Sequence, residues 1–276
     1  MKEFKGSVAV VTGAGSGIGA AMARALAKAG MKVAVADIEA EAADETANAI
    51  CANGGQAVAY RVDITQPTSV AELKDQVRAA FGTCHLVCAN AGVCLFGRLE
   101  QRSLKDWEWV FSVNVMGTVH TVQAFLPMLK EHPGNAHIVI TASMSGLLAG
   151  APGKGVYNAS KHAVMAYGET LREEMSDEGV GVSLLMPGGV KSRIVQSGRN
   201  RPREFGESTP VTEADIQLVI RGTGDTEAAE PDYAVRNLLR GIEQNQPWIF
   251  THESKQWPRI EQRFAAILRA CDLAKE

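Results

Sequence analysis

The chain lacks three features that would place it in a specialised class. Its 276 residues contain only 5 cysteines, too few for the disulfide framework of a small secreted domain. Basic residues number 28 against 31 acidic ones, so the basic excess of a nucleic-acid-binding surface is missing. No stretch approaches the roughly 18 consecutive apolar residues of a membrane-spanning helix, and residues 1–5 lead straight into an apolar run without room for a signal peptide. We therefore expect a cytoplasmic protein whose partners are neither nucleic acid nor membrane.

Some of the few cysteines form a cluster that could suggest a metal site. Cys84, His85, Cys88 and Cys94 lie close together in the sequence. Their spacing matches no common zinc-binding pattern. Residues 85–89 are typical of a buried strand, in which cysteine is a small apolar residue. We therefore expect no metal site.

Short apolar runs alternate with helical segments along the chain. Strands are predicted at 8–11, 32–36, 57–62, 85–89, 136–141, 180–186 and 248–251. Helices are predicted at 20–29, 39–52, 67–81, 104–130, 156–176, 231–244 and 256–273. This alternation predicts an α/β fold: a single domain with a doubly wound, parallel, seven-stranded sheet and helices on both faces. Ligands of such sheets bind beyond the carboxyl ends of the strands.

A glycine-rich stretch connects the first predicted strand to the first helix. It runs Thr12-Gly13-Ala14-Gly15-Ser16-Gly17-Ile18-Gly19. Glycines allow a tight turn and a close approach of the backbone to a pyrophosphate, and the helix N-terminus adds free N–H groups and partial positive charge. Glycines alone would also suit an ordinary turn, but the strand–loop–helix context favours a dinucleotide site.

Asp37 stands at the end of the second predicted strand. A carboxylate there can accept hydrogen bonds from the adenosine ribose hydroxyls and would repel a 2′-phosphate, which predicts NAD rather than NADP. Ser16 agrees, because a basic residue in the loop would favour the extra phosphate. The alternative role for Asp37 is to cap the helix that begins near Glu39.

Two further polar groups follow predicted strands. Asp63, after the third strand, could bond the adenine edge, or could make the turn before Thr65. Asn90-Ala91-Gly92 follows the fourth strand. Gly92 would let the backbone pass a cofactor, and the Asn90 amide could tie neighbouring strands, so its structural and binding roles are not separable from the sequence.

Tyr157 and Lys161 lie four positions apart, on one face of a predicted helix. A nearby ammonium stabilises a phenolate and is expected to lower the tyrosine pKa. The tyrosine then serves as a general base towards an alcohol, or a general acid towards a ketone. Ser143, after the fifth strand, could hold the substrate oxygen. Asn114 either breaks its helix near Val113 or holds a water that relays a proton from Lys161.

Together these motifs resemble the short-chain dehydrogenases/reductases over nearly the whole chain. The resemblance rests on the glycine-rich stretch, Asp37, Asp63, Asn90-Ala91-Gly92, Asn114, Ser143, Tyr157-x-x-x-Lys161 and Pro187-Gly188. It implies a Rossmann-type fold and a catalytic tetrad of Asn114, Ser143, Tyr157 and Lys161. It also implies that Lys161 holds the nicotinamide ribose and that Val190 and Ser192 contact the carboxamide. Ala89 and Ser192 replace the family's usual Asn and Thr, with no catalytic group lost.

The predicted cofactor-binding residues therefore come from most parts of the chain. They are Gly13, Ser16, Gly17, Ile18, Gly19, Asp37, Ile38, Asp63, Ile64, Asn90, Ala91, Gly92, Tyr157, Lys161, Pro187, Gly188, Val190 and Ser192. The resemblance further implies that the helices at 113–130 and 156–176 pair across a two-fold axis, giving a homodimer or homotetramer.

A narrower resemblance concerns residues 185–194, residues 197–202 and the C-terminal part from Thr251. These are similar to bacterial Cα-dehydrogenases of lignin-derived aryl ethers, which oxidise a benzylic secondary alcohol to a ketone with NAD. The same subgroup contains many members of unknown substrate, so the analogy carries modest weight.

The predicted substrate wall is mostly apolar. Ser143 and Tyr157 are joined there by Cys94, Leu95, Phe96, Met144, Leu147, Leu148, Met186, Gly188 and Ile194. The long stretch 194–230, rich in Pro, Gly and Arg, interrupts the alternation and is predicted to be a substrate lid. Its arginines could bind a substrate carboxylate, or could belong to a solvated loop. Residues 252–276 are expected to form a C-terminal helical extension.

The sequence thus predicts an NAD-dependent oxidoreductase that interconverts a secondary alcohol and a ketone, with a bulky aryl or alicyclic small molecule as substrate. An NADPH-dependent carbonyl or ketoacyl reductase is the first alternative, against which Asp37 and Ser16 argue. A catalytically silent NAD-binding regulator is the second, against which the complete tetrad argues.

Overall fold

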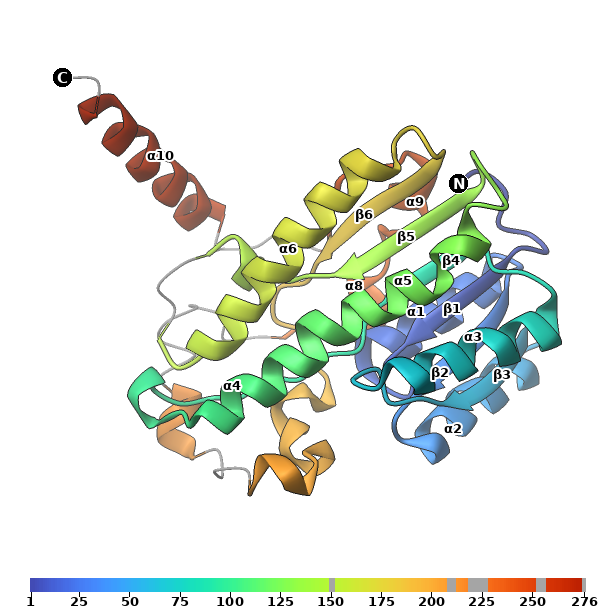
Figure 1. The fold of residues 1–276 in the computed structure, drawn as a ribbon, viewed down its shortest axis with the longest axis horizontal. Helices are drawn as coiled ribbons and strands as arrows, with labels where there is room; N and C mark the ends of the chain where they lie inside the picture. The colour runs from blue at the N-terminus through green and yellow to red at the C-terminus, as the bar shows by residue number, and fades with distance from the viewer. Residues whose placement is uncertain (149–151, 208–211, 218–227, 252–256, 275–276) are drawn as a thin grey trace.

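The computed structural model describes residues 1–148, 152–207, 212–217, 228–251 and 257–274. Seven parallel strands form one sheet in the order β3-β2-β1-β4-β5-β6-β7, which confirms the predicted fold (Figure 1). The strands are β1 Val8–Thr12, β2 Lys32–Asp37, β3 Gln56–Arg61, β4 Leu86–Ala89, β5 Ala136–Thr141, β6 Val180–Met186 and β7 Trp248–Phe250. The strand order reverses between β1 and β4, so the ligand crevice is expected beyond the carboxyl ends of these two strands.

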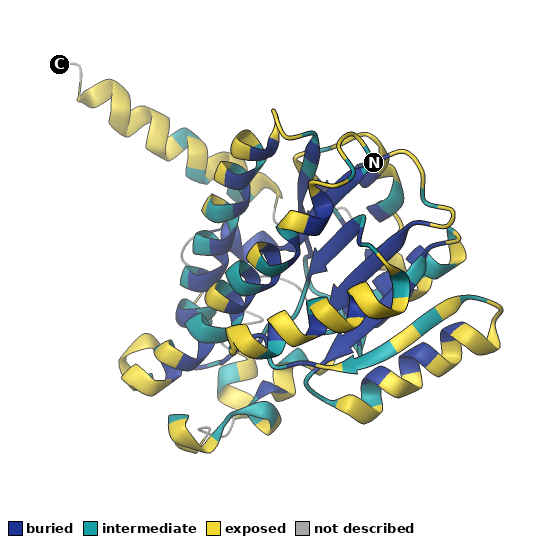
Figure 2. Ribbon diagram, turned by 45° about the vertical axis from the view of Figure 1, so that its right-hand side comes forward, coloured by how far each residue is buried: buried dark blue, intermediate teal, exposed yellow. Residues whose placement is uncertain are grey.

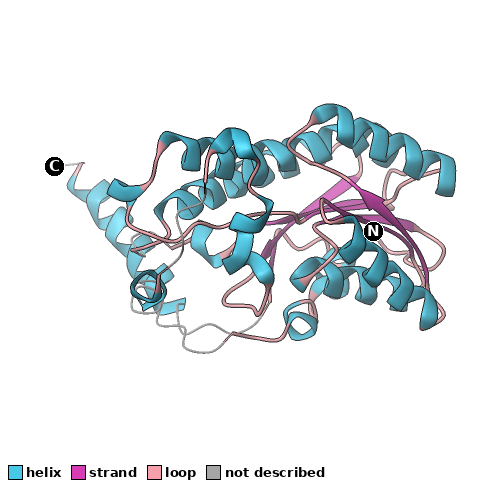
Figure 3. Cartoon of the chain, turned by 90° about the horizontal axis from the view of Figure 1, so that it is seen from below, coloured by secondary structure: helices cyan, strands magenta, loops and turns pink. Residues whose placement is uncertain are grey.

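Helices cover both faces of the sheet (Figure 3). One face packs against α3 Pro67–Phe81, α5 Gly117–Leu129 and α6 Gly155–Met175, and the other against α1 Gly17–Lys28, α2 Ala40–Ala52 and α9 Leu238–Glu243. Side chains alternate along β1, with Val8 and Val10 in the first core and Ala9 and Val11 in the second. A strand buried on both faces explains the continuous apolar runs in the sequence.

Two cysteines of the sequence cluster lie on opposite faces of the sheet, because Cys84 precedes β4 and does not follow its alternation. Cys84 packs in the core on one face of the sheet, and Cys88 packs in the core on the other. Within the described ranges, no three His, Cys, Asp or Glu side chains come together as a metal site would require.

Two predicted helices are interrupted. The helix predicted at 104–130 consists of α4 Leu104–Phe111, a π-helical turn at Ser112–Met116, and α5. A π-turn inserts one residue without ending the helix, so the apolar pattern runs through it unchanged. The helix predicted at 231–244 is divided into α8 Pro231–Ala234 and α9, and Asn237 between them donates its amide to the Phe250 carbonyl at 3.0 Å.

The C-terminal helix stands apart from the rest of the chain. It is α10 Trp257–Leu273, and Gln256, where it was predicted to begin, lies outside the described residues. It points away from the sheet, and none of its residues is buried (Figure 2). Neither α10 nor another helix in the described part of the chain is long and apolar enough to cross a membrane.

Candidate active site

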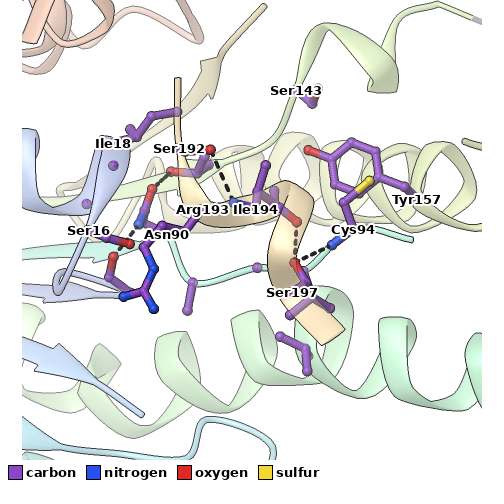
Figure 4. A pocket seen from close by; sticks show the side chains of 18 of the residues that line it. Ser16, Ile18, Asn90, Cys94, Ser143, Tyr157, Ser192, Arg193, Ile194 and Ser197 are labelled. Atoms are coloured by element: carbon purple, nitrogen blue, oxygen red, sulfur yellow. Dashed lines mark hydrogen bonds between the residues drawn. The ribbon is translucent and has the colours of Figure 1, made fainter. Parts of the chain in front are cut away.

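A pocket of about 480 Å³ opens at the carboxyl ends of the strands (Figure 4). All eighteen predicted cofactor-binding residues line it, from Gly13 after β1 to Ser192 after β6. Three of the four predicted catalytic residues, Ser143, Tyr157 and Lys161, line it too. Residues that lie far apart in the sequence therefore meet where a doubly wound sheet binds its ligand.

None of the four glycines of the glycine-rich loop leaves room for a Cβ; one on Gly15 would lie 2.8 Å from Ala42 Cβ. A Cβ on Gly19 would lie 2.0 Å from the Gly13 carbonyl oxygen, and one on Gly13 would lie 2.7 Å from Ala91 Cα. Gly17 has φ of +54° and would place a Cβ 2.9 Å from Ser192 Cβ. Glycine is therefore required both by backbone conformation and by the close packing of neighbouring segments.

The N-terminus of α1 faces this loop. Its N-cap residue Ser16 makes no side-chain bond to the helix N–H groups, and the first turn carries no acidic residue. The positive end of the helix is thus left to attract an anion in the pocket.

Asp37 is fixed at the end of β2 by backbone groups. Its Oδ2 accepts a hydrogen bond from Gly15 N at 2.8 Å, and its Oδ1 accepts one from Glu39 N at 3.0 Å. Each carboxylate oxygen keeps further acceptor capacity towards the pocket. The N-cap of α2 is Glu39, so Asp37 is not the cap of that helix.

Asp63 and Asn90 both make structural bonds as well as lining the pocket. Asp63 Oδ1 accepts from the Thr65 amide and hydroxyl at 2.9 and 2.7 Å, which is the predicted turn. Asn90 Nδ2 donates to Thr12 O at 2.9 Å, and its Oδ1 accepts from Thr141 Oγ1 at 3.0 Å. The Asn90 side-chain amide therefore links the end of β4 to β1 and β5, which is the structural role that the sequence predicted for it.

Asn114 lies in the π-turn behind the pocket and is completely buried. Its side chain accepts from Val93 N at 2.8 Å and donates to Val93 O at 3.0 Å and to Ser160 Oγ at 2.9 Å. The helix does lose its regularity near Val113, as one interpretation predicted. Its amide joins the loop after β4 to the residue next to Lys161.

Tyr157, Ser143 and Lys161 converge in the pocket. Figure 4 shows the Tyr157 hydroxyl facing Ser143, with Cys94 beside the ring. Lys161 is buried, its Nζ donates to Thr141 O at 2.8 Å, and it lies 5.8 Å from the centre of the Tyr157 ring. Burial lowers the pKa of Lys161 to about 8, so the ammonium still predominates at neutral pH.

The predicted lowering of the Tyr157 pKa is wrong for the polypeptide alone. Burial raises the pKa of Tyr157, the Cys94 thiol adds to the rise, and a hydrogen bond with Ser143 only partly opposes it. The reason is that the Lys161 ammonium is bonded to Thr141 rather than to the phenol oxygen. Loss of water around the phenol therefore outweighs the attraction of the more distant charge.

The substrate wall is only partly as predicted. Cys94, Phe96, Met144, Gly188 and Ile194 line the pocket. The remaining apolar candidates do not: Leu95 packs near Trp109, Met186 belongs to the core under the sheet, Leu147 accepts a hydrogen bond from Arg263, and Leu148 is buried beside the site. Trp109, Val113, Lys154 and Pro202 line the pocket without having been predicted, since only the fold brings them there.

The chain after β6 crosses the pocket as two 3₁₀ turns that meet at a kink at Gln196; we call this stretch, Arg193–Asn200, the crossing segment. Its arginines are engaged by protein carboxylates rather than only by solvent. Arg193 and Arg199 form ion pairs with Glu39. Arg201, just beyond the crossing segment, forms a buried ion pair with Asp106 at 2.5 Å. These residues begin the predicted lid 194–230, of which 208–211 and 218–227 lie outside the described residues.

Comparison with known proteins agrees with this geometry. A family model described as short chain dehydrogenase matches residues 7–203. A C alpha-dehydrogenase from Sphingobium sp. is 30% identical over 269 residues, covering 97% of this chain and 87% of that protein. A 1-deoxy-11-beta-hydroxypentalenate dehydrogenase from Streptomyces exfoliatus is 40% identical over 77% of each chain. A crystal structure of a short chain dehydrogenase/reductase from Burkholderia phymatum in complex with NAD has a TM-score of 0.90 and 36% identity, covering 98% of this chain and 97% of that one.

Proposed function

Because the chain belongs to the short-chain dehydrogenase family, we propose that it is an NAD-dependent oxidoreductase interconverting a secondary alcohol and a ketone. The observation that carries the proposal is the convergence of Ser143, Tyr157 and Lys161 in the pocket that Asp37 also lines. The pocket joins proton-transfer groups at one end to a ribose-binding carboxylate at the other. That is the pairing which a nicotinamide-dependent reaction needs.

The residues present fit a dinucleotide. The glycine-rich loop leaves no room for a Cβ at Gly13 or Gly19, and the uncompensated N-terminus of α1 suits a pyrophosphate. We assign Asp37 to the adenosine ribose, Asp63 to the adenine edge, Lys161 to the nicotinamide ribose, and Val190 with Ser192 to the carboxamide. When bound, the nicotinamide supplies the acceptor or donor of hydride.

Proton transfer falls to Tyr157. In ketone reduction the phenol donates its proton to the carbonyl oxygen, and in alcohol oxidation the phenolate accepts the hydroxyl proton. Ser143 donates a hydrogen bond to the same substrate oxygen and stabilises developing negative charge. Burial raises the pKa of Tyr157 in the polypeptide alone, which favours the protonated phenol, the acid of ketone reduction.

Asn114 acts through its neighbours in this mechanism. Its amide bonds to Val93 and Ser160 hold the loop after β4 against α6, which carries Tyr157 and Lys161. We therefore propose that Asn114 is a positioning residue that sets the distance between these two elements.

The pocket wall favours a bulky apolar substrate. Cys94, Phe96, Trp109, Met144 and Ile194 supply a largely apolar surface. The names of the relatives, a C alpha-dehydrogenase and a pentalenate dehydrogenase, support an aryl or alicyclic alcohol. Part of residues 194–230 is proposed to close over such a substrate as a lid, in a cytoplasmic enzyme.

The test is a screen of the purified chain with NAD or NADP and a panel of secondary aryl, terpenoid and steroid alcohols. Formation of reduced cofactor is followed by its absorbance, with the matching ketones and reduced cofactor tested in reverse. We expect turnover of at least one bulky secondary alcohol with NAD, and none of the matched primary alcohols. A preference for NADP would contradict the proposal. Binding of NADH with neither oxidation of an alcohol nor reduction of a ketone would contradict it too.

We further propose that the chain assembles as a homodimer or homotetramer through α5 and α6. Light scattering should give a mass at least twice the 29.5 kDa of one chain. A monomer at all concentrations would rule this out.

A further inference from the structure

The crossing segment lies directly over the glycine-rich loop. Ser192, which precedes it, sits where a side chain on Gly17 would be, and Arg193, Ile194 and Ser197 line the pocket (Figure 4). Ser197 Oγ accepts a hydrogen bond from Cys94 N at 3.1 Å, on the opposite wall. The segment therefore forms part of the wall of the pocket that the proposed dinucleotide would occupy.

One carboxylate holds this segment to the rest of the pocket. Glu39, the N-cap of α2, accepts from Arg199 Nη2 at 2.6 Å, from Arg193 Nη2 at 3.2 Å and from Asn200 Nδ2 at 3.3 Å. Arg199 also donates to the carbonyls of Arg193 and Gln196 at 3.0 and 3.1 Å, so it organises the segment internally. The hydrogen bond from Arg199 is the main cause that lowers the pKa of Glu39.

The two anchors of the segment differ in exposure. The Glu39 and Arg199 side chains are each 27% exposed, whereas those of Asp106 and Arg201 are 4% and 3% exposed. A partly exposed ion pair is weakened by water and salt, whereas separating a buried pair leaves a charge without solvent or partner. The bonds to Glu39 are therefore the weaker of the two anchors and the easier to break.

We propose that Glu39 is a positioning residue that keeps the crossing segment closed over the pocket, and that breaking its bonds to Arg193, Arg199 and Asn200 admits and releases NAD(H). The second part rests on the proposed function; the first does not. Glu39 N also bonds Asp37, so the clamp and the proposed ribose site share one turn of three residues. A movement of Glu39 that opens the pocket therefore also shifts Asp37, the carboxylate proposed to bind the ribose.

The clamp can be tested without any cofactor, through the accessibility of Cys94. This thiol is buried under the segment, while Cys84 and Cys88 are buried in the sheet core and report global unfolding. Labelling with N-ethylmaleimide is followed by mass spectrometry in wild type, Glu39→Gln and Glu41→Gln. Glu41 is an exposed carboxylate in the first turn of the same helix and is the matched control.

In Glu39→Gln, Cys94 should react with N-ethylmaleimide about fivefold faster than in wild type, the size expected for loss of a partly exposed ion-pair network. In Glu41→Gln, the labelling rate of Cys94 should equal that of wild type. Cys84 and Cys88 should label at the wild-type rate in both variants. Equal labelling of Cys94 in Glu39→Gln and wild type would overturn the clamp, and so would faster labelling of all three thiols, which would mean general destabilisation.

The link to the cofactor is tested by the rate at which bound NADH is displaced. Glu39→Gln should release NADH about fivefold faster, and the double variant with Arg193→Gln should be no faster than that, because the Arg193 side chain bonds the same carboxylate and both changes break one interaction. Wild-type release should accelerate with salt, while release from Glu39→Gln should not. Additive effects, or equal salt dependence, would contradict the gating role. Failure of wild type to bind NADH would refute the proposed function and leave the Cys94 result to decide the clamp.

Discussion

The two sides of the pocket are held in shape by different forces. On the glycine-loop side, formed after β1, β2 and β4, backbone conformation and close packing place each group, as at Gly13, Gly19 and Asn90. On the crossing-segment side, ion pairs between distant parts of the chain do so, through Glu39 and Asp106. Steric overlap is insensitive to salt and pH, whereas ion pairs respond to both. We expect the first side to be rigid and the second to be the adjustable one.

The largest effect is expected on the glycine-loop side, from Gly19→Ala. The new Cβ would lie 2.0 Å from the Gly13 carbonyl, so α1 or the loop must move. We expect the free energy of unfolding to fall by about 4 kcal/mol and NADH binding to be lost. The control is Gly54→Ala, which has φ of +80° but nothing within 4 Å of its Cβ, and should lose only about 1 kcal/mol through backbone strain. Urea denaturation measures the free energy of unfolding, and NADH titration measures cofactor binding. Similar losses of stability in the two variants would argue against a steric origin.

Asp106→Asn tests the buried anchor of the other side. It leaves Arg201 buried beside the Trp109 ring without its carboxylate, which should lower the free energy of unfolding by about 3 kcal/mol. The matched control is Glu108→Gln on the same helix, because its pair with Lys105 is exposed and contributes below about 1 kcal/mol. Equal effects of the two variants in urea denaturation would show that burial does not set the strength of the Asp106 pair.

The pH dependence of that difference has a definite sign. Burial alone would raise the pKa of Asp106, but the bonds from Arg201 and Ser103 outweigh it, so the folded pKa lies below its ordinary value. A carboxylate with a lowered folded pKa contributes stability that is complete above the unfolded pKa and is lost as pH falls through the folded one. The gap between wild type and Asp106→Asn should therefore be full at neutral pH and shrink in acid, and a gap that grows on acidification would contradict the ion pair.

Tyr157→Phe probes the chemistry between the two sides. It removes the proton donor while keeping almost all of the volume, so kcat should fall by at least about 10²-fold with NADH affinity nearly unchanged. Rates and NADH titration on the same preparation separate the two effects. Near-normal turnover of the variant would mean that another group transfers the proton.

The smallest effect is expected from Asp37→Ser. Removing the carboxylate that would face a 2′-phosphate should shift the ratio of kcat/KM for NAD over NADP by about tenfold towards NADP. The folded structure should persist, since the change removes only two hydrogen bonds from backbone N–H groups, both of them part-buried. The ratio is measured with one substrate and both cofactors, and an unchanged ratio would remove Asp37 from cofactor choice.

The glycine-loop side was largely predictable from the sequence. Its groups come directly after strands, and the carboxyl ends of parallel strands meet at one edge of the sheet. Gly13, Asp37, Asp63 and Asn90, which follow β1, β2, β3 and β4, therefore all line one pocket, although the strands lie in the order β3-β2-β1-β4. The i, i+4 spacing of Tyr157 and Lys161 placed them on one helix face in the same local way.

The alternation of strands and helices, the requirement for glycine after β1 and the cofactor-side groups that line the pocket were thus all predictable from the amino-acid sequence. Four features emerged only in the folded chain: the pairing of Arg199 with Glu39, the burial of Asp106 with Arg201, the π-turn around Asn114, and the direction of the Tyr157 pKa shift. Local patterns follow from backbone sterics and side-chain periodicity, which act over a few residues. Ion pairs and desolvation depend on which distant residues approach and how much water remains, and those are properties of the folded chain alone.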